Sequence, residues 1–366
     1  MKKLRIDEPF VLESGEVLSH LEIAYHTFGS LNAKGDNVVW ICHALTGNSD
    51  PMEWWPGIVG TGRVIDPDHD FIVCANALGS CYGTTGPASV NLETGEVYGE
   101  SFPFITVRDM VQAQQVLQRQ LGVDQIRLGI GGSMGGQQLL EWAIMAPDLF
   151  ENICLLASNA RHSAWGIAFN ETQRMAIKAD LSTKAGQMER GRKGLEAARA
   201  IAMLSYRTYD AYQVSQTETS GDTIDNFRAS SYQRYQGEKF WKRFDVYAYL
   251  TLSKAMDSHN VSRGRDVVEK VLEKVKAKTL VISIRSDVLF PEAEQELIAK
   301  NIPDAFWEII DSPYGHDGFL IEAEAVADRL GKFRNGKLKR NASRAPLSGN
   351  SIESLTGWAL PGTEDF

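Results

Sequence analysis

Ser133 is the residue of this sequence whose surroundings most clearly indicate chemistry. It lies in the run Gly-Gly-Ser-Met-Gly-Gly at 131–136, between an apolar stretch at 126–130 and a helical pattern that follows. A serine at a sharp strand-to-helix turn has a strained backbone, and glycines around it avoid side-chain clashes. Its hydroxyl projects above the sheet, and the first amide of the helix, that of Met134, can point at a developing oxyanion. The pattern predicts Ser133 as a nucleophile and Met134 as an oxyanion donor.

His316 is the predicted base. A serine hydroxyl is a weak nucleophile unless a base takes its proton, and that base must be oriented by an acid. In serine hydrolases built on a parallel sheet, the three residues follow the chain order serine, acid, histidine. His316 lies in a loop after the last expected strand, which is where this order places the base. His162 comes too early for this role, and His259 precedes the next strand.

The orienting acid is expected at the end of the strand before that histidine loop. The apolar stretch at 280–284 runs into Arg-Ser-Asp, which makes Asp287 the first choice. Asp311 is the alternative, because it also ends a strand close to His316. It ends the strand that leads directly into the histidine loop, however, and this is one strand too late.

A second oxyanion donor is expected in the loop after an early strand. The apolar stretch at 38–42 leads into His-Ala-Leu-Thr-Gly at 43–47, so the amide of Leu45 is the candidate. His43 precedes Ser133 in the chain, which favours a structural role in fixing this loop. The glycine-rich stretch at 79–87 matches neither a dinucleotide fingerprint nor a P-loop and is interpreted as a wall of the site, with phosphate binding as the lesser alternative.

The elements that must position these residues follow from the hydrophobic pattern. Helical patterns at 106–121 and 292–301 alternate with apolar runs, which predicts a mostly parallel sheet with helices on both faces. Segments 10–18 and 21–28 alternate around Ser14 and Gly15 and predict an antiparallel hairpin at the sheet edge. The expected buried strands lie at 38–42, 71–75, 126–130, 153–157, 280–284 and 306–310.

The strand rhythm is interrupted in the middle of the chain. Residues 161–260 read as helical with few strand signals, which predicts a lid inserted into an α/β core formed by 1–160 and 261–333. The tail at 334–366 begins with a basic, polar run and continues with Pro, Gly and Ser. It is expected to be solvated or docked on a partner rather than to bind nucleic acid.

Composition limits the classes of function. The 366-residue chain has a net charge of −9, with 43% hydrophobic and 23% charged residues, which argues against a nucleic-acid-binding surface. No apolar stretch approaches the ~20 residues of a membrane span, and the polar residues after the start do not resemble a signal peptide. We therefore expect a cytoplasmic protein. The four cysteines have no metal-ligand spacing and are expected to be reduced thiols: Cys42, Cys74, Cys81 and Cys154.

Seven segments together resemble one enzyme family, the homoserine O-acetyltransferases of methionine biosynthesis. These enzymes have the α/β-hydrolase fold with a helical lid, and the resemblance extends over 16–320. The segments are Cys-His-Ala-Leu-Thr-Gly at 42–47, the loop at 76–87, the serine turn at 131–136, Ala-Phe-Asn-Glu at 168–171, Tyr-Gln-Gly-Glu-Lys-Phe at 235–240, Arg-Phe-Asp at 243–245 and Pro-Tyr-Gly-His-Asp at 313–317.

The resemblance implies that an acetyl group moves from acetyl-CoA to the hydroxyl of L-homoserine through an acyl-serine. It implies acetyl-CoA as a substrate with no separate cofactor or metal, and a homodimer packed through the lids. Carried over by motif, Arg199 binds the amino-acid carboxylate, Asp317 holds the ammonium and Tyr206 lies beside them. The sequence itself leaves Arg199 open, because an internal partner such as Glu196 satisfies a guanidinium as well as a substrate does.

Several alternatives remain open at this point. The same triad could transfer a succinyl group, use serine as the acceptor, or act as an esterase with water. A binding protein without catalysis is disfavoured because it has no use for a strained serine turn. The segments at 181–192 and 245–249 depart from the family pattern, and both lie in the lid, where they are expected to shape the substrate pocket.

Overall fold

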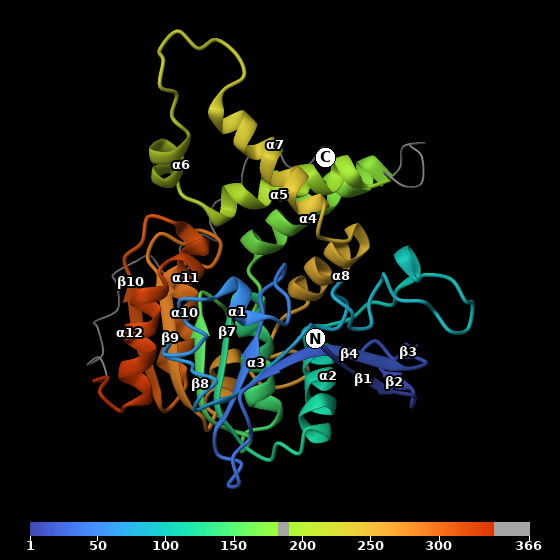
Figure 1. The fold of residues 1–366 in the computed structure, drawn as a ribbon, viewed down its shortest axis with the longest axis vertical. Helices are drawn as coiled ribbons and strands as arrows, with labels where there is room; N and C mark the ends of the chain where they lie inside the picture. The colour runs from blue at the N-terminus through green and yellow to red at the C-terminus, as the bar shows by residue number, and fades with distance from the viewer. Residues whose placement is uncertain (182–189, 340–366) are drawn as a thin grey trace.

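The computed structural model describes residues 1–181 and 190–339, and an eight-stranded sheet forms its centre (Figure 1). Six strands are parallel, and two at one edge, β1 and β4, run antiparallel to their neighbours. The predicted α/β fold is confirmed. In sheet order the strands are β1 (Lys2–Ile6), β4 (Leu21–Phe28), β6 (Phe71–Ala75), β5 (Val38–Cys42), β7 (Ile126–Gly132), β8 (Phe150–Leu156), β9 (Lys278–Ile284) and β10 (Ala305–Ile310).

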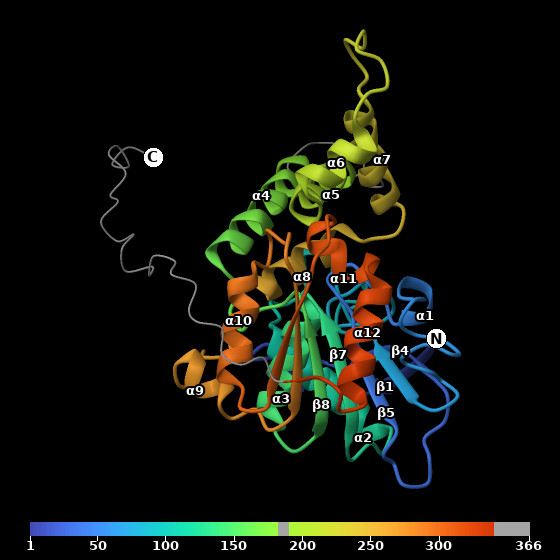
Figure 2. The same ribbon diagram turned by 90° about the vertical axis from the view of Figure 1, so that its left-hand side faces the viewer.

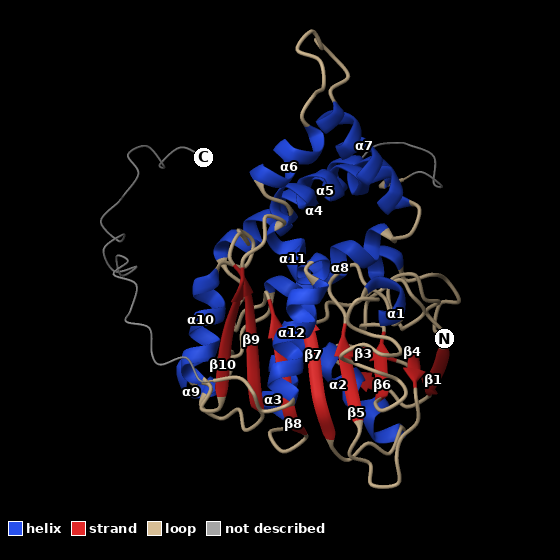
Figure 3. Ribbon diagram, turned by 60° about the vertical axis from the view of Figure 1, so that its left-hand side comes forward, coloured by secondary structure: helices blue, strands red, loops and turns tan. Residues whose placement is uncertain are grey.

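Both faces of the sheet are covered, which explains why its strands read as continuous apolar runs. All five residues of β5 are buried. Val38 and Trp40 pack in one apolar cluster, whereas Val39 and Ile41 pack in another on the opposite face. Figure 3 shows the helices on the two sides of the sheet. The first cluster includes residues of α2 (Val107–Gln120), α3 (Met134–Met145) and α10 (Glu292–Asn301), and the second includes residues of α12 (Ala323–Arg334).

The helices predicted from the sequence form close to their expected bounds. α2 begins after Thr106, whose side chain accepts a hydrogen bond from the amide of Asp109 while Asp109 binds the Thr106 amide in return. α10 spans 292–301 as expected. Each of the predicted apolar runs also lies wholly or mainly within a strand.

The predicted hairpin between 10–18 and 21–28 is wrong. The small hairpin lies entirely within the first of these segments, where β2 (Phe10–Val11) pairs with β3 (Val17–Leu18) as a separate sheet. β4 pairs instead with β1 on one side and β6 on the other. Strand β1 is the antiparallel edge partner of β4. Its alternating Lys, Leu, Arg and Ile contain too few apolar residues to predict a strand from the sequence.

The lid is a layer of helices above the carboxyl ends of the strands (Figures 1 and 2). Its two ends meet, because Arg161 and Asn260 form a β-bridge and the amide of His162 donates to the carbonyl of His259 at 2.9 Å. The chain leaves and re-enters the core at one point. The helices of this layer are α4 (Ala164–Leu181), α5 (Arg192–Tyr206), α6 (Tyr209–Gln216), α7 (Arg228–Trp241) and α8 (Val246–Asp257), and α9 (Val268–Leu272) follows after the return.

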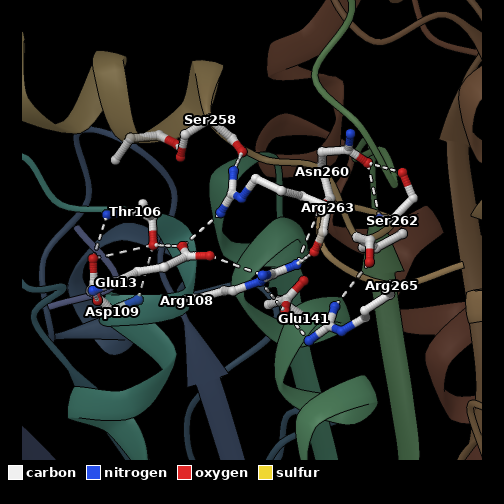
Figure 4. Close-up of polar contacts among 12 residues, drawn as sticks. Glu13, Thr106, Arg108, Asp109, Glu141, Ser258, Asn260, Ser262, Arg263 and Arg265 are labelled. Atoms are coloured by element: carbon white, nitrogen blue, oxygen red, sulfur yellow. Dashed lines mark hydrogen bonds and ion pairs between the residues drawn. The ribbon is translucent and has the colours of Figure 1, made fainter. Parts of the chain in front are cut away.

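An ion-pair network fixes the segment after the lid on the core (Figure 4). The Glu141 side chain, on α3 and 1% exposed, accepts from Arg108 at 3.0 Å and from Arg265 at 2.6 Å. Glu13 pairs with Arg108 at 2.9 Å and with Arg263 at 2.6 Å. The two carboxylates thereby join the N-terminal hairpin, α2, α3 and the lid return.

Parts of the predicted tail and lid are not among the described residues. Most of the predicted tail, 340–366, lies outside the described residues, as does 182–189 in the lid. Across the described ranges, none of the helices combines the length and the apolar character needed to cross a membrane.

Candidate active site

Ser133 lies at the junction of β7 and α3 with a φ of 55° and a ψ of −126°. A non-glycine residue in this region is strained, and such strain persists only where its surroundings hold it. The neighbouring glycines are required by space, because a Cβ on Gly135 would lie 2.0 Å from the carbonyl oxygen of Cys42 and one on Gly131 would lie 2.4 Å from that of Gly135. The tight turn places Ser133 on the wall of a cavity beyond the end of β7.

Asp287 and His316 form a hydrogen-bonded pair. The Nδ1–H of His316 donates to Oδ2 of Asp287 at 2.7 Å, and Oδ1 of Asp287 accepts from the amides of Leu289 and Phe290 at 2.8 and 2.9 Å. With the proton held on Nδ1, the other ring nitrogen is free to accept a proton from a hydroxyl. The alternative acid, Asp311, points elsewhere: its side chain is 78% exposed and pairs with Arg285.

Aromatic rings hold the His316 imidazole in place. The ring of Phe290 stacks on it with centroids 5.0 Å apart, Phe319 packs edge-on at 5.4 Å, and Tyr206 approaches from the lid at 5.7 Å.

The other two histidines considered for the base are buried, and burial lowers the pKa of His162 to about 4 and that of His259 to about 3. Both are neutral near pH 7 and belong to the packing between lid and core.

Ser133 and His316 line one cavity of about 440 Å³ between the sheet and the lid. The core contributes Leu45 and Asp317 to its walls, and the lid contributes Arg199 and Tyr206. The predicted site residues on its walls therefore come from four separate parts of the chain. Further lining residues that the sequence did not single out for a role are Glu53, Trp54, Tyr82, Arg207, Arg243, Phe319 and Leu320.

The peptide that carries the Leu45 amide is held firmly. The carbonyl oxygen of Ala44 accepts from Nδ1 of His43 at 2.8 Å and from the amide of Gly47 at 2.9 Å. A peptide unit is planar and trans, so fixing this carbonyl fixes the Leu45 N–H in the opposite direction. Among the described residues, no acceptor binds that N–H. The amide of Met134, first in α3, is one of the donors that a helix leaves unsatisfied at its start.

His43 is suited to hold this peptide at any moderate pH. Its Nε2 accepts from the amide of Ala77 at 2.9 Å, so the ring proton is on Nδ1, where it binds the Ala44 carbonyl. Burial lowers the pKa of His43 to about 4, which keeps the ring neutral. From the lid side, Arg243 donates to the carbonyl of Thr46 and to the hydroxyl of Tyr82, both at 2.9 Å.

The guanidinium of Arg199 packs over the rings of Tyr206 and Phe240, at 5.4 and 5.3 Å from their centroids. Glu196, the internal partner considered from the sequence, pairs instead with Arg192 at 2.9 Å and Lys193 at 2.8 Å. Within 1–181 and 190–339, no carboxylate pairs with Arg199. A half-buried cation with aromatic rings on its faces and no counter-charge is suited to bind a substrate carboxylate.

Asp317 has a partner that the sequence did not reveal. Its Oδ2 lies 2.8 Å from Nε of Arg207, the first residue after α5. Arg207 follows the predicted site residue Tyr206, and Arg243 begins the Arg-Phe-Asp segment. No spacing rule gives a role to a residue whose partner lies about a hundred or more positions away.

The two segments that depart from the family pattern do not line this cavity where they are described. Leu181, Arg190 and Tyr247 line a second cavity, of about 400 Å³, between α4, α8 and the segment at 99–105. The described residues of these segments are thus not among those that line the Ser133 cavity, and their effect on the substrate pocket stays a prediction.

The four cysteines are not among the residues that line the Ser133 cavity. All four cysteines are free, and burial raises the pKa of Cys42 to about 12 and that of Cys81 to about 11. Over the described part of the chain, His, Cys, Asp and Glu do not gather in groups of three or more that could hold a metal ion.

Comparisons with known proteins agree with this geometry. A family model for the alpha/beta hydrolase fold matches residues 37–323. A homoserine O-acetyltransferase of Trichormus variabilis is 46% identical over 89% of this chain and 91% of its own length, and one of Chlorobaculum tepidum is 48% identical over 90% and 93%. The crystal structure of a homoserine O-acetyltransferase from Staphylococcus aureus superposes with a TM-score of 0.78 at 30% identity, covering 94% of this chain and 97% of that one. These matches confirm the resemblance, and the chain belongs to the homoserine O-acetyltransferases of the α/β-hydrolase fold.

Proposed function

We propose that this chain transfers the acetyl group of acetyl-CoA to the hydroxyl of L-homoserine, a step of methionine biosynthesis, through an acetyl-serine at Ser133. The observation that carries the proposal is one cavity that contains Ser133, His316 and two recognition charges, Arg199 and Asp317. A triad alone suits many acyl transfers. A cation and an anion beside it suit a zwitterionic acceptor.

In the first half-reaction, the free ring nitrogen of His316 takes the proton of the Ser133 hydroxyl as Oγ attacks the thioester carbonyl carbon. The amides of Leu45 and Met134 stabilise the oxyanion that forms. Asp287 stabilises the imidazolium and keeps its orientation. When the tetrahedral intermediate collapses, the carbon–sulfur bond breaks, and the CoA thiolate leaves with the proton from His316. Ser133 then carries the acetyl group.

The second half-reaction reverses the roles. His316 takes the proton of the homoserine hydroxyl, whose oxygen attacks the acetyl carbon in the same oxyanion hole. The bond to Ser133 Oγ breaks, and this oxygen recovers its proton from His316. The triad supplies every proton transfer, so we propose that no cofactor is needed besides the acyl donor. The acceptor is held by its carboxylate on Arg199 and by its ammonium on Asp317, with Tyr206 between them and His316.

Initial rates test this function. When homoserine is varied at several acetyl-CoA concentrations, one nucleophile serving both substrates in turn should give parallel double-reciprocal lines. Succinyl-CoA in place of acetyl-CoA, and serine in place of homoserine, should both be poorer substrates. Intersecting lines would contradict the acyl-serine route. Equally fast CoA release with and without acceptor would instead favour the esterase alternative.

The acceptor assignment predicts a specific kinetic pattern. Arg199→Ala and Asp317→Asn should each raise the KM for homoserine and lower kcat/KM by ~30- to 1000-fold, because a charged hydrogen bond in a partly dry site contributes ~2–4 kcal/mol. The rate of Ser133 acetylation should not change. Arg199→Lys should not restore the KM, because an ammonium lacks the two-pronged geometry of a guanidinium.

A control on the same helix separates recognition from folding. Lys193→Ala removes a cation that is 75% exposed and pairs with Glu196, so it should leave homoserine kinetics unchanged. If Arg199→Ala behaves like this control, or if it only lowers the melting temperature, the arginine is not part of the acceptor site.

We also propose a cytoplasmic homodimer joined through the lid. Large apolar side chains on α5, α6 and α7 are left in solvent: Leu204, Tyr209, Val214 and Tyr235 are 58%, 75%, 90% and 58% exposed. Four free cysteines are consistent with a reducing compartment. Light scattering should give about twice the 40.6 kDa mass of one chain, and a monomer mass would contradict the dimer.

A further inference from the structure

The guanidinium of Arg207 is paired with Asp317, the carboxylate that the ammonium of the acceptor would need. Its Nε lies 2.8 Å from Oδ2 of Asp317, and both side chains are mostly withdrawn from solvent, at 26% and 17% exposure. Arg207, Asp317 and Ser133 line the same cavity. If Asp317 holds the ammonium of homoserine, as the proposed function requires, the guanidinium of Arg207 and the substrate ammonium must compete for one carboxylate.

The contact between Arg207 and Asp317 is a close ion pair with poor hydrogen-bond geometry. Nε of Arg207 is buried yet makes no properly directed hydrogen bond within the described residues. A charged pair of this kind keeps its Coulomb attraction but forgoes the directional part of a charge-assisted hydrogen bond. A ligand ammonium with three donors can therefore replace the guanidinium without a large loss.

The surroundings offer the displaced guanidinium other contacts. It already lies over the ring of Tyr314, at 6.0 Å from the centroid. The hydroxyl of Tyr212, on α6, is buried without a hydrogen-bond partner among the residues described, and the charges of Arg207, Arg199 and Asp317 all act on it. Arg207 can leave Asp317 without being left beside apolar atoms alone.

Arg207 also lies where the lid sits on the histidine loop. A Cβ on Gly315, whose φ is +64°, would lie 3.0 Å from the carbonyl oxygen of Tyr206, so lid backbone packs directly on the residue before His316. The next lid residue, Thr208, donates to the carbonyl of Pro313. The ion pair of Arg207 with Asp317 is thus only one of several contacts between the lid and the histidine loop. The other contacts remain when a substrate ammonium replaces Arg207 at Asp317.

We propose that Arg207 is a specificity-determining residue that covers Asp317 in the free enzyme and is displaced by the ammonium of the acceptor. An acceptor with an ammonium replaces one cation by another at Asp317. An acceptor without it leaves the internal pair in place and gains only the carboxylate contact with Arg199. Arg207 therefore lowers the apparent affinity for homoserine while keeping Asp317 paired whenever no ammonium is present.

The test is a cycle of two substitutions measured on the acceptor half-reaction. Arg207→Gln keeps a polar side chain but removes the competing charge, so the KM for homoserine should fall by about 3- to 10-fold, the scale of one partly exposed ion pair. Selectivity for homoserine over 4-hydroxybutanoate, which lacks the ammonium, should rise by a similar factor. The rate of Ser133 acetylation should stay the same, and Arg207→Lys should keep a KM close to that of the wild type.

The decisive comparison is made in the Asp317→Asn variant, which lacks the carboxylate for which Arg207 and the substrate ammonium compete. There, Arg207→Gln should no longer change the KM for homoserine, so the two substitutions should be strongly non-additive. Arg234→Gln, which removes an arginine of α7 that lines no part of the Ser133 cavity, is the matched control. A KM that rises in Arg207→Gln, or an effect that persists in the Asp317→Asn background, overturns the proposal. A wild-type enzyme that does not acetylate homoserine would instead contradict the proposed function.

Discussion

Ser133→Ala should yield no acetyl-enzyme and should lower turnover with acetyl-CoA and homoserine by ~10⁴-fold or more. The effect is large because nucleophile, base and acid act as one unit, and removing any of them leaves only binding and the oxyanion hole. His316→Ala should cause a loss of the same order. Single-turnover release of CoA, followed by a thiol reagent, measures the acetylation step directly.

The choice of acid has its own matched control. Asp287→Asn should also cost several orders of magnitude, because an amide cannot hold the Nδ1–H of His316 as a carboxylate does at 2.7 Å. Asp311→Asn applies the same chemical change to the other strand-end acid, which is exposed and pairs with Arg285, and should leave turnover unchanged. Full activity in Asp287→Asn, or a large loss in Asp311→Asn, would reverse the assignment.

Glu141→Ala should destabilise the fold by ~3–5 kcal/mol, because it leaves Arg108 and Arg265 without the buried carboxylate that both contact. The network in Figure 4 joins the lid return to α2 and α3, so the loss should appear in the cooperative unfolding of the core. Urea unfolding followed by circular dichroism measures the free energy of unfolding.

Glu273→Ala serves as its control. Glu273 pairs with Lys270 in an exposed i,i+3 contact, at 49% and 58% side-chain exposure, and such contacts contribute ~0–1 kcal/mol. A Glu141 variant that is no less stable than this control would mean that the two arginines find other partners, and the network would then not hold the lid return.

The catalytic elements were readable from the sequence because each depends on local pattern and chain order. Gly131, Gly135 and Ser133 are neighbours in the chain. The steric reason for Gly131 is the carbonyl of Gly135, four residues later, whereas the reason for Gly135 is the carbonyl of Cys42 at the end of β5. The choice of Asp287 over Asp311 needed only the rule that acid and base follow successive strands. The geometry of the Asp287–His316 pair is the one that this rule anticipates.

The strand pairing at the sheet edge and the partners of the charged site residues depend on contacts between distant parts of the chain. A single sequence does not encode such contacts in any simple pattern. The hairpin prediction was wrong because β4 pairs with β1 and β6. Pairing partners are set by the whole sheet rather than by alternation within one segment. Arg207 and Asp317 are 110 positions apart, and nothing local to either residue indicates the other. Arg199 likewise has no carboxylate partner within 1–181 and 190–339, because Glu196 pairs with Arg192 and Lys193 instead, and the sequence alone does not indicate this choice.

The most direct test of the acetyl-serine is intact-protein mass spectrometry after mixing the enzyme with acetyl-CoA and no acceptor. The account predicts one added acetyl group per chain, located on Ser133 by peptide mapping, with release of one equivalent of CoA. Addition of homoserine should remove the label and yield O-acetylhomoserine. An unlabelled protein that still makes product, or a label on any residue other than Ser133, would contradict the account.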